Sequence, residues 1–520
     1  MKFKILFDKI IIVLLTIAAA IVFVTSFFTT IYYDMHVDVD YPHYKSETIS
    51  HLALSMLAVF LFFLFFYKKN LFEYSKKLIA IALIFCTAYC LLLILSIKPL
   101  PVDDSKFLDD ALLQFANGNY GSLTHGGGYL NTWPFQLGYF FFGQIVDKIF
   151  GHGNYFAWDI ILLISILVTV FYLYRITWEM FENKVICGIM ALLSMGMLFF
   201  YNYSTYIYGD ILSMGPQTAA LYYIILYIKR DKTKYAMVSA PCIALSVLLK
   251  TNSEITLIAM IMLIMFSVIK EKNNENGYFS YEIPHRIVQR VLVSAFVVFV
   301  VFLSKAAVEA YYCNLTGLES IPGGSPSASH IAMGLQESEL EDGWYNGYNY
   351  KVFGENDFDT ELTKAVAVEN IMERLHYFAG HPKYALKFFF RKFLTQWADS
   401  VCISTHNLDL VSRHVENPTA MMYYIVFGSG SIIIRWIMNV FMSVCYLCVI
   451  IYLASRIRTK QISHSEMLLL ILIFGGMLFH QFWEGSSRYA MRYYVYWLPY
   501  AAYGMEKLLQ AVNRRFLKCQ

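Results

Sequence analysis

The chain has 520 residues, of which 58% are hydrophobic and only 15% are charged, with a formal net charge of +3. Soluble domains carry about 25% charged residues, so this composition excludes a soluble globular protein and indicates a polytopic membrane protein. The sequence has no basic patch interleaved with aromatic residues, which excludes a nucleic-acid-binding protein.

Apolar segments recur along the whole chain, and most approach the length of about 20 residues that a helix needs to cross a bilayer. They cover residues 9–31, 49–67, 78–97, 157–174, 185–203, 209–228, 235–249, 253–270, 289–310, 434–455, 466–483 and 489–510. The sequence therefore predicts an all-α polytopic membrane protein with about 12 transmembrane helices. The first segment lacks a small-residue cleavage site, so we expect it to be a retained anchor.

Basic residues are concentrated in alternate loops, as the positive-inside rule requires. Lysines precede the first segment, and Lys68, Lys69, Lys76 and Lys77 follow the second, whereas the loop between these two segments is acidic. We therefore expect a multi-pass protein of the plasma membrane with both termini in the cytoplasm. The 133–150 stretch would break this alternation if it spanned the membrane, so it is predicted to be a juxtamembrane helix at the outer surface.

These boundaries divide the chain into five regions. Transmembrane helices at 1–97 precede an extracytoplasmic acidic loop with its juxtamembrane helix at 98–156. A transmembrane core at 157–310 precedes an extracytoplasmic region at 311–433, which we expect to be mostly helical. Transmembrane helices at 434–520 complete the chain. Cys313 and Cys402 both fall in the outer region, and whether they form a disulfide is left open.

Carboxylates gather at the start of the acidic loop, where Asp103, Asp104, Asp109 and Asp110 lie within eight positions. Such a cluster is either a solvated loop or a functional site at the membrane surface. Asp210 lies where the sixth predicted span begins, and a carboxylate at a membrane boundary is functional by default. Its alternative role is that of a helix N-cap.

Two cations near the outer ends of predicted spans are candidate phosphate ligands. The guanidinium of Arg488 matches phosphate oxygens, although an ion pair with Glu484, four residues earlier, is the alternative. The Lys250 ammonium is a second candidate, with snorkelling to the interface as its alternative. No histidine spacing predicts a metal site; a divalent cation held by Asp104 and Asp210 is left as an alternative.

Several short motifs, in chain order, resemble those of the GT-C superfamily of membrane glycosyltransferases. They are the acidic 101–104 stretch with Ala111 and Gly118, the proline-led 133–136 stretch, 208–210, the outer-region stretches 330–335 and 343–347, and 484–489. The arrangement is similar to the branch of protein O-mannosyltransferases and aminoarabinose transferases, with its relatives in bacterial cell envelopes. In the simplest members the acidic loop follows the first helix, so the first two helices here look like an addition. The common Asp-Glu pair is Asp103-Asp104 in this chain.

The resemblance implies a GT-C-like bundle that transfers a sugar from a polyprenyl phosphate to an acceptor outside the membrane, with inversion. A carboxylate base would take the proton of the acceptor hydroxyl. We expect Asp104 to be this base, with Asp103 and Asp210 as the other catalytic candidates. The expected substrate-binding residues are Arg488, Lys250, Glu484, Tyr489, Tyr208 and Arg492.

The expected acceptor is an envelope glycan, a lipid or a protein, and the expected oligomeric state is a monomer. A transporter or flippase of lipid-linked glycans is the alternative from another class. Transporters usually carry inverted repeats and helices broken at the bilayer midplane, and the sequence shows neither. An envelope-polysaccharide polymerase or ligase is a third interpretation.

Overall fold

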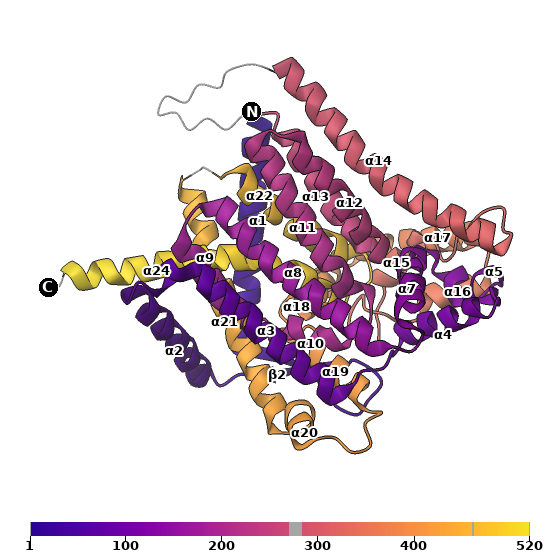
Figure 1. Ribbon diagram of the computed structural model, residues 1–520, viewed down its shortest axis with the longest axis horizontal. Coiled ribbons are helices and arrows are strands. Elements are labelled where there is room, and N and C mark those ends of the chain that lie inside the picture. Colours follow the sequence, from indigo (N-terminus) through magenta and orange to yellow (C-terminus); the bar gives the residue numbers. More distant parts are fainter. Residues whose placement is uncertain (1, 270–282, 460–461, 519–520) are drawn as a thin grey trace.

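The computed structural model describes residues 2–269, 283–459 and 462–518 (Figure 1). Over these ranges the chain is mostly helical, with one small antiparallel sheet formed by β1 (Thr29–Tyr33) and β2 (Pro42–Ser46). This hairpin lies between the first two long helices. The prediction of an all-α membrane protein is confirmed.

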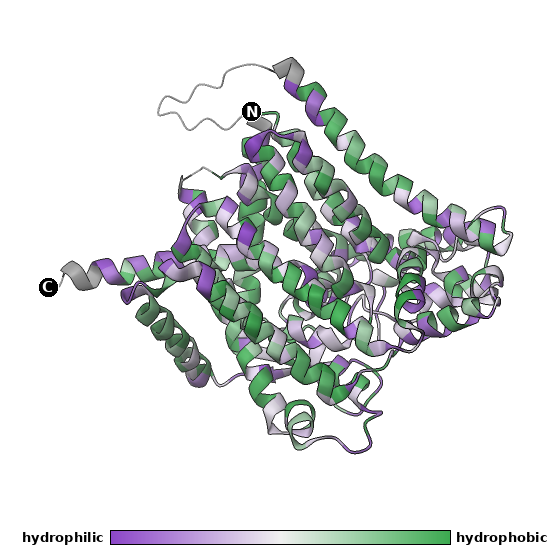
Figure 2. Cartoon of the chain, in the orientation of Figure 1, coloured by the Kyte–Doolittle hydropathy of each residue, from purple (hydrophilic) through white to green (hydrophobic). Residues whose placement is uncertain are grey.

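Eight of the described helices are long and apolar enough to cross a bilayer. Figure 2 shows that several of them are built mostly of hydrophobic residues, most plainly α2 and α3. A bent pair, α9 (Lys184–Ser194) and α10 (Leu198–Asn202), would make a ninth span. The eight are α1 (Lys2–Phe28), α2 (Ile49–Lys68), α3 (Ser75–Ile97), α8 (Tyr155–Phe181), α11 (Gly209–Arg230), α14 (Ile283–Thr316), α21 (Ser429–Thr459) and α22 (His464–Phe482).

The predicted number of about 12 spans is larger than this, for reasons visible in three segments. The segments at 235–249 and 253–270 become α12 (Thr233–Leu249) and α13 (Glu254–Phe266), which are apolar but short; residue 270 lies outside the described ranges. The segment at 489–510 is divided among α23 (Ser487–Tyr494), η5 (Val495–Trp497) and α24 (Leu498–Lys518). Residues 490–502 are buried against other helices, so their apolar character reflects protein packing and not lipid contact.

Residues 311–433, called the outer region, are mostly helical, as predicted. Three of its helices, α15, α16 and α17, lie with α4 (Asp104–Ala116) and α7 (Leu137–Phe150) at the right-hand end of Figure 1. The stretch predicted to be a juxtamembrane helix forms η2 (Pro134–Gln136) and α7. The remaining outer helices are α15 (Ser327–Gly334), α16 (Tyr348–Glu355), α17 (Thr360–Gly380), α18 (Pro382–Trp397), α19 (Ser404–Ser412) and α20 (Ala420–Val426).

Helix α11 is the most enclosed of the spans and packs against both α8 and α12. Gly209, at its first position, permits a close approach to the end of α12, because a Cβ there would collide with the carbonyl oxygen of Leu249. The absence of a side chain therefore brings the start of α11, and with it Asp210, next to Lys250.

Candidate active site

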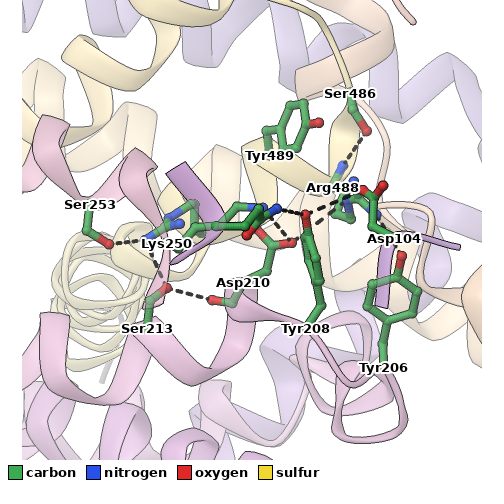
Figure 3. A network of polar contacts seen from close by, with 12 residues as sticks. Asp104, Tyr206, Tyr208, Asp210, Ser213, Lys250, Ser253, Ser486, Arg488 and Tyr489 are labelled. Atoms are coloured by element: carbon green, nitrogen blue, oxygen red, sulfur yellow. Dashed lines mark hydrogen bonds and ion pairs between the residues drawn. The ribbon is translucent and has the colours of Figure 1, made fainter. Parts of the chain in front are cut away.

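The candidate site forms where the ends of several segments meet. Asp104 is the first residue of α4, Asp210 lies in the first turn of α11, and Lys250 lies between α12 and η4 (Thr251–Ser253). Arg488 comes from α23, near the end of the chain. Figure 3 shows these side chains converging in one polar network.

Asp210 is the centre of this network and is only 1% exposed. The Nζ atom of Lys250 lies 3.3 Å from Oδ1 of Asp210, and Nε of Arg488 lies 3.9 Å from Oδ2. The N-cap of α11 is Tyr208, not Asp210, so the N-cap alternative is wrong. Two cations therefore face this one buried carboxylate.

Lys250 does not snorkel to the interface. Its side chain is 11% exposed, is paired with Asp210, and places Nζ 4.2 Å from the centre of the Tyr208 ring. A cation over an aromatic face is attracted by the ring quadrupole. The ring and the carboxylate together hold the ammonium inside the site.

Arg488 is held by aromatic residues as well as by Asp210. Its Nη1 donates a hydrogen bond to the hydroxyl of Tyr206 at 2.9 Å, and its guanidinium lies 5.5–5.7 Å from the ring centres of Tyr206, Tyr208 and Tyr489. Among the described ion pairs of Arg488 the partner is Asp210 and not Glu484. The helical ion pair with Glu484 is not formed because α23 begins only at Ser487.

Glu484 connects the site to the outer region. Its carboxylate accepts a hydrogen bond from the hydroxyl of Tyr489 at 3.1 Å and lies 4.0 Å from Nδ1 of His330. The His330 ring stacks on Trp483 at 4.9 Å. Burial raises the pKa of Glu484 to about 7, against the opposing charge of Arg488. The 330–335 motif therefore meets the 484–489 motif directly.

The 343–347 motif reaches the same loop. The amide of Gly485 donates to the carbonyl of Gly343 at 2.8 Å, and Trp344 forms an isolated parallel bridge with Gly485. The Trp344 side chain is 1% exposed. Both outer-region motifs thus support the loop that carries Glu484.

Asp104 is linked to the network through Tyr208. The Tyr208 hydroxyl donates to Oδ2 of Asp104 at 3.4 Å and accepts from Nε2 of Gln136 at 2.5 Å. Asp103 immediately precedes α4 with φ +50° and has an exposed side chain, whereas Asp104 is half-buried. The two neighbouring carboxylates therefore occupy different surroundings at the start of a helix.

Arg492 lies behind the site. It is 1% exposed, and its Nη2 donates to Ser213, Gln217 and Ser253 at 3.2, 2.7 and 2.8 Å. These bonds tie α23 to α11 and η4, the segments that carry Asp210 and adjoin Lys250. Arg492 therefore lies in the protein interior behind Lys250 and Arg488 and helps to keep these two cations in position.

Asp104 and Asp210 do not fit a divalent cation. Asp210 already faces Lys250 and Arg488, and two adjacent cations oppose a third positive charge. In the described part of the chain no group of three His, Cys, Asp or Glu side chains could hold a metal ion. The thiols of Cys313 and Cys402 are both free, so the disulfide left open above is not formed.

Three contributors to the site escaped the sequence analysis: Tyr206, Gln136 and Asp40. Gln136 lies within the 133–136 motif and Tyr206 lies two residues before the 208–210 motif, so closeness to a motif is the signal that the sequence offers for them. Asp40 lies on the loop between β1 and β2; burial raises its pKa to about 6, and the charge of Arg488 opposes that rise. Only the fold brings this loop near Arg488.

A protein-family model described as dolichyl-phosphate-mannose-protein mannosyltransferase matches residues 136–305. This segment contains Gln136, Tyr208, Asp210 and Lys250. No curated protein matches the sequence.

Two similar solved structures are those of ArnT from Cupriavidus metallidurans, one in the apo state and one bound to undecaprenyl phosphate. Each is 10% identical to this chain. The matches cover 83% and 84% of this chain and 77% of ArnT, with TM-scores of 0.30 and 0.29.

Proposed function

We propose that this multi-pass membrane protein, whose resemblance to the GT-C glycosyltransferases is confirmed by the family match over residues 136–305, transfers a sugar from a polyprenyl-phosphate donor to an acceptor hydroxyl. The observation that carries the proposal is the pair of cations, Lys250 and Arg488, facing the single buried carboxylate of Asp210. The matched family is named for a dolichyl-phosphate-linked sugar donor, which supports a lipid phosphate as the anion.

Lys250 and Arg488 would bind the donor phosphate. A phosphate leaving group already carries charge, so it needs cationic donors rather than a strong acid. Asp210 would keep both cations in place when no donor is bound. The rings of Tyr208 and Tyr489 flank the cations and would exclude water from the phosphate.

Asp104 would be the general base. The acceptor hydroxyl attacks the anomeric carbon, its proton passes to the Asp104 carboxylate, and the bond between the anomeric carbon and the phosphate oxygen breaks. The sugar inverts its configuration and polyprenyl phosphate leaves. The Tyr208 hydroxyl would orient Asp104, and the exposed Asp103 would lie on the acceptor side.

The basic loops support an extracytoplasmic face for this chemistry, because the positive-inside rule keeps such loops in the cytoplasm. The acceptor would then be an envelope glycan, a lipid or a protein. A flippase would need its substrate site near the bilayer midplane. The network described here lies instead at the ends of α11, α12 and α22, which favours the transferase.

The test is sugar transfer in proteoliposomes that contain a radiolabelled polyprenyl-phosphate sugar and an envelope extract as acceptor. Asp104→Asn is expected to lower kcat by about 10²–10⁴-fold, the range that general-base catalysis supplies. Asp103→Asn, one residue away, is the matched variant and should retain most of the rate. Equal rates for both variants would remove Asp104 from the mechanism, and absence of transfer by the unsubstituted protein would overturn the proposal.

A further inference from the structure

Asp399 is a buried carboxylate with an unusually complete set of hydrogen bonds. It follows α18 and is 1% exposed. Its Oδ2 accepts from the hydroxyls of Tyr33 at 2.8 Å and Ser487 at 2.5 Å, and from the amide of Ile403 at 3.1 Å. The amide of Val401 donates to Oδ1 at 2.9 Å.

These bonds join three distant parts of the chain. Tyr33 is the last residue of β1, after the first span; Asp399 belongs to the outer region; and Ser487 is the first residue of α23. The Tyr33 and Ser487 hydroxyls also lie 3.2 Å apart. The hairpin between the first two long helices is thus attached to the start of the helix that carries Arg488.

Helix α23 depends on such attachments. It has eight residues, and a helix this short is not stable by itself in water. At its start, the Ser486 side chain accepts from the amide of Arg488 at 3.3 Å, and Asp399 holds the next residue, Ser487. Any movement of Ser487 would move the adjoining Arg488 away from Tyr206 and Asp210.

We propose that Asp399, with Tyr33 and Ser487, is a positioning residue that fixes Arg488 in the active site. A buried charge costs free energy unless it is fully hydrogen-bonded, and packed apolar residues often stabilise a fold as well as a buried charge does. We therefore assign the Asp399 carboxylate, with its four hydrogen-bond donors, to holding these segments in position more than to stabilising the fold. The positioning of Arg488 by Asp399 does not depend on the proposed function; only its expected effect on donor binding does.

The first test is the structure of the Asp399→Asn variant in lipid nanodiscs. Whichever way the amide turns, its NH2 group faces at least one N–H or O–H donor that the carboxylate accepted. We expect the 2.9 Å contact between Arg488 and Tyr206 to be lost. An Arg488 side chain that stays in place would overturn the proposal. Should this variant fail to fold, Tyr33→Phe and Ser487→Ala each remove one hydroxyl and are read in the same way.

Glu466→Gln is the matched control for loss of a buried carboxylate. Glu466 is 5% exposed and accepts from the Tyr452 hydroxyl at 2.7 Å, at the end of α22 opposite to the site. This variant should leave the contact between Arg488 and Tyr206 intact. Displacement of Arg488 in the control as well would show a general loss of packing and would count against a specific role for Asp399.

The second test is a double-mutant cycle on the KM for the polyprenyl-phosphate sugar. Asp399→Asn alone is expected to raise KM about tenfold, with a smaller change in kcat, because one cationic contact to the phosphate is weakened. In the Arg488→Ala background the same substitution should change KM less than about twofold. A full tenfold effect in that background would overturn the proposal. If the unsubstituted protein transfers no sugar, the proposed function fails, whereas the position of Arg488 in the variant structure still decides this inference.

Discussion

At the scale of single residues, Glu484 combines burial with contacts to His330 and Tyr489. Its side chain is 14% exposed, and burial raises its pKa from 4.5 to about 7. The folded state therefore binds this proton more tightly than the unfolded state. The contribution of Glu484 to the free energy of unfolding is fully present below about pH 4.5. It is lost as the pH rises to 7, and the total loss is roughly 3 kcal/mol.

The Glu484→Gln variant removes this pH dependence. Relative to the unsubstituted protein, its thermal stability is expected to improve as the pH is raised from 5 to 8, because the variant has no carboxyl group to ionise in a buried position. Thermal unfolding in detergent at both pH values is the measurement. Asp110→Asn, which changes an exposed carboxylate of α4, should give no such trend. An equal trend in the two variants would contradict the assignment to Glu484.

At the scale of elements, Lys392 of α18 fastens the outer region to the end of α22. It is fully buried and donates to the carbonyls of Gly334 and Trp483, the second at 2.7 Å. Lys392→Met would leave two buried carbonyls without their donor. We expect the free energy of unfolding to fall by about 2–4 kcal/mol, since each unsatisfied group costs about 1–2 kcal/mol.

The matched control is Lys387→Met, which changes an exposed lysine of the same helix. Its unfolding should differ from that of the unsubstituted protein by less than about 0.5 kcal/mol. Chemical denaturation followed by tryptophan fluorescence compares the two, since Trp483 and Trp344 lie beside the attachment. Equal stability of both variants would mean that the carbonyls find other donors.

The elements also show what the sequence could predict. Asp210, Lys250 and Arg488 are charged residues at the ends of predicted spans, and this can be recognised in the sequence. Each of them could therefore be predicted individually as a site residue. Their pairing could not, because it depends on how close α11 comes to α12 at Gly209. Asp399 and Tyr33 gave no local signal: one follows an amphipathic helix and the other ends a short strand, and their roles exist only in the folded protein. The 489–510 segment was predicted to be one span because apolar residues buried by protein, such as 490–502, resemble residues buried by lipid.

At the scale of the whole molecule, the remaining prediction concerns the side of the membrane on which the site lies. Basic loops resist translocation, so the loop at Lys69, with its lysine neighbours, should stay in the cytoplasm. Because α3 is a candidate span between Lys69 and α4, we expect α4 and the adjoining network to lie outside. Lys106 is exposed on α4 and Lys69 is exposed after α2, so cysteines at these two positions report opposite sides.

In a background whose native cysteines are replaced by serine, a membrane-impermeant maleimide should label Lys106→Cys in intact cells. Lys69→Cys should react only after the membrane is permeabilised, and serves as the internal control. The reverse pattern would place Asp104 in the cytoplasm. An Asp104 on that side could not serve the proposed transfer to an acceptor outside the cell, so this labelling pattern also tests the proposed function.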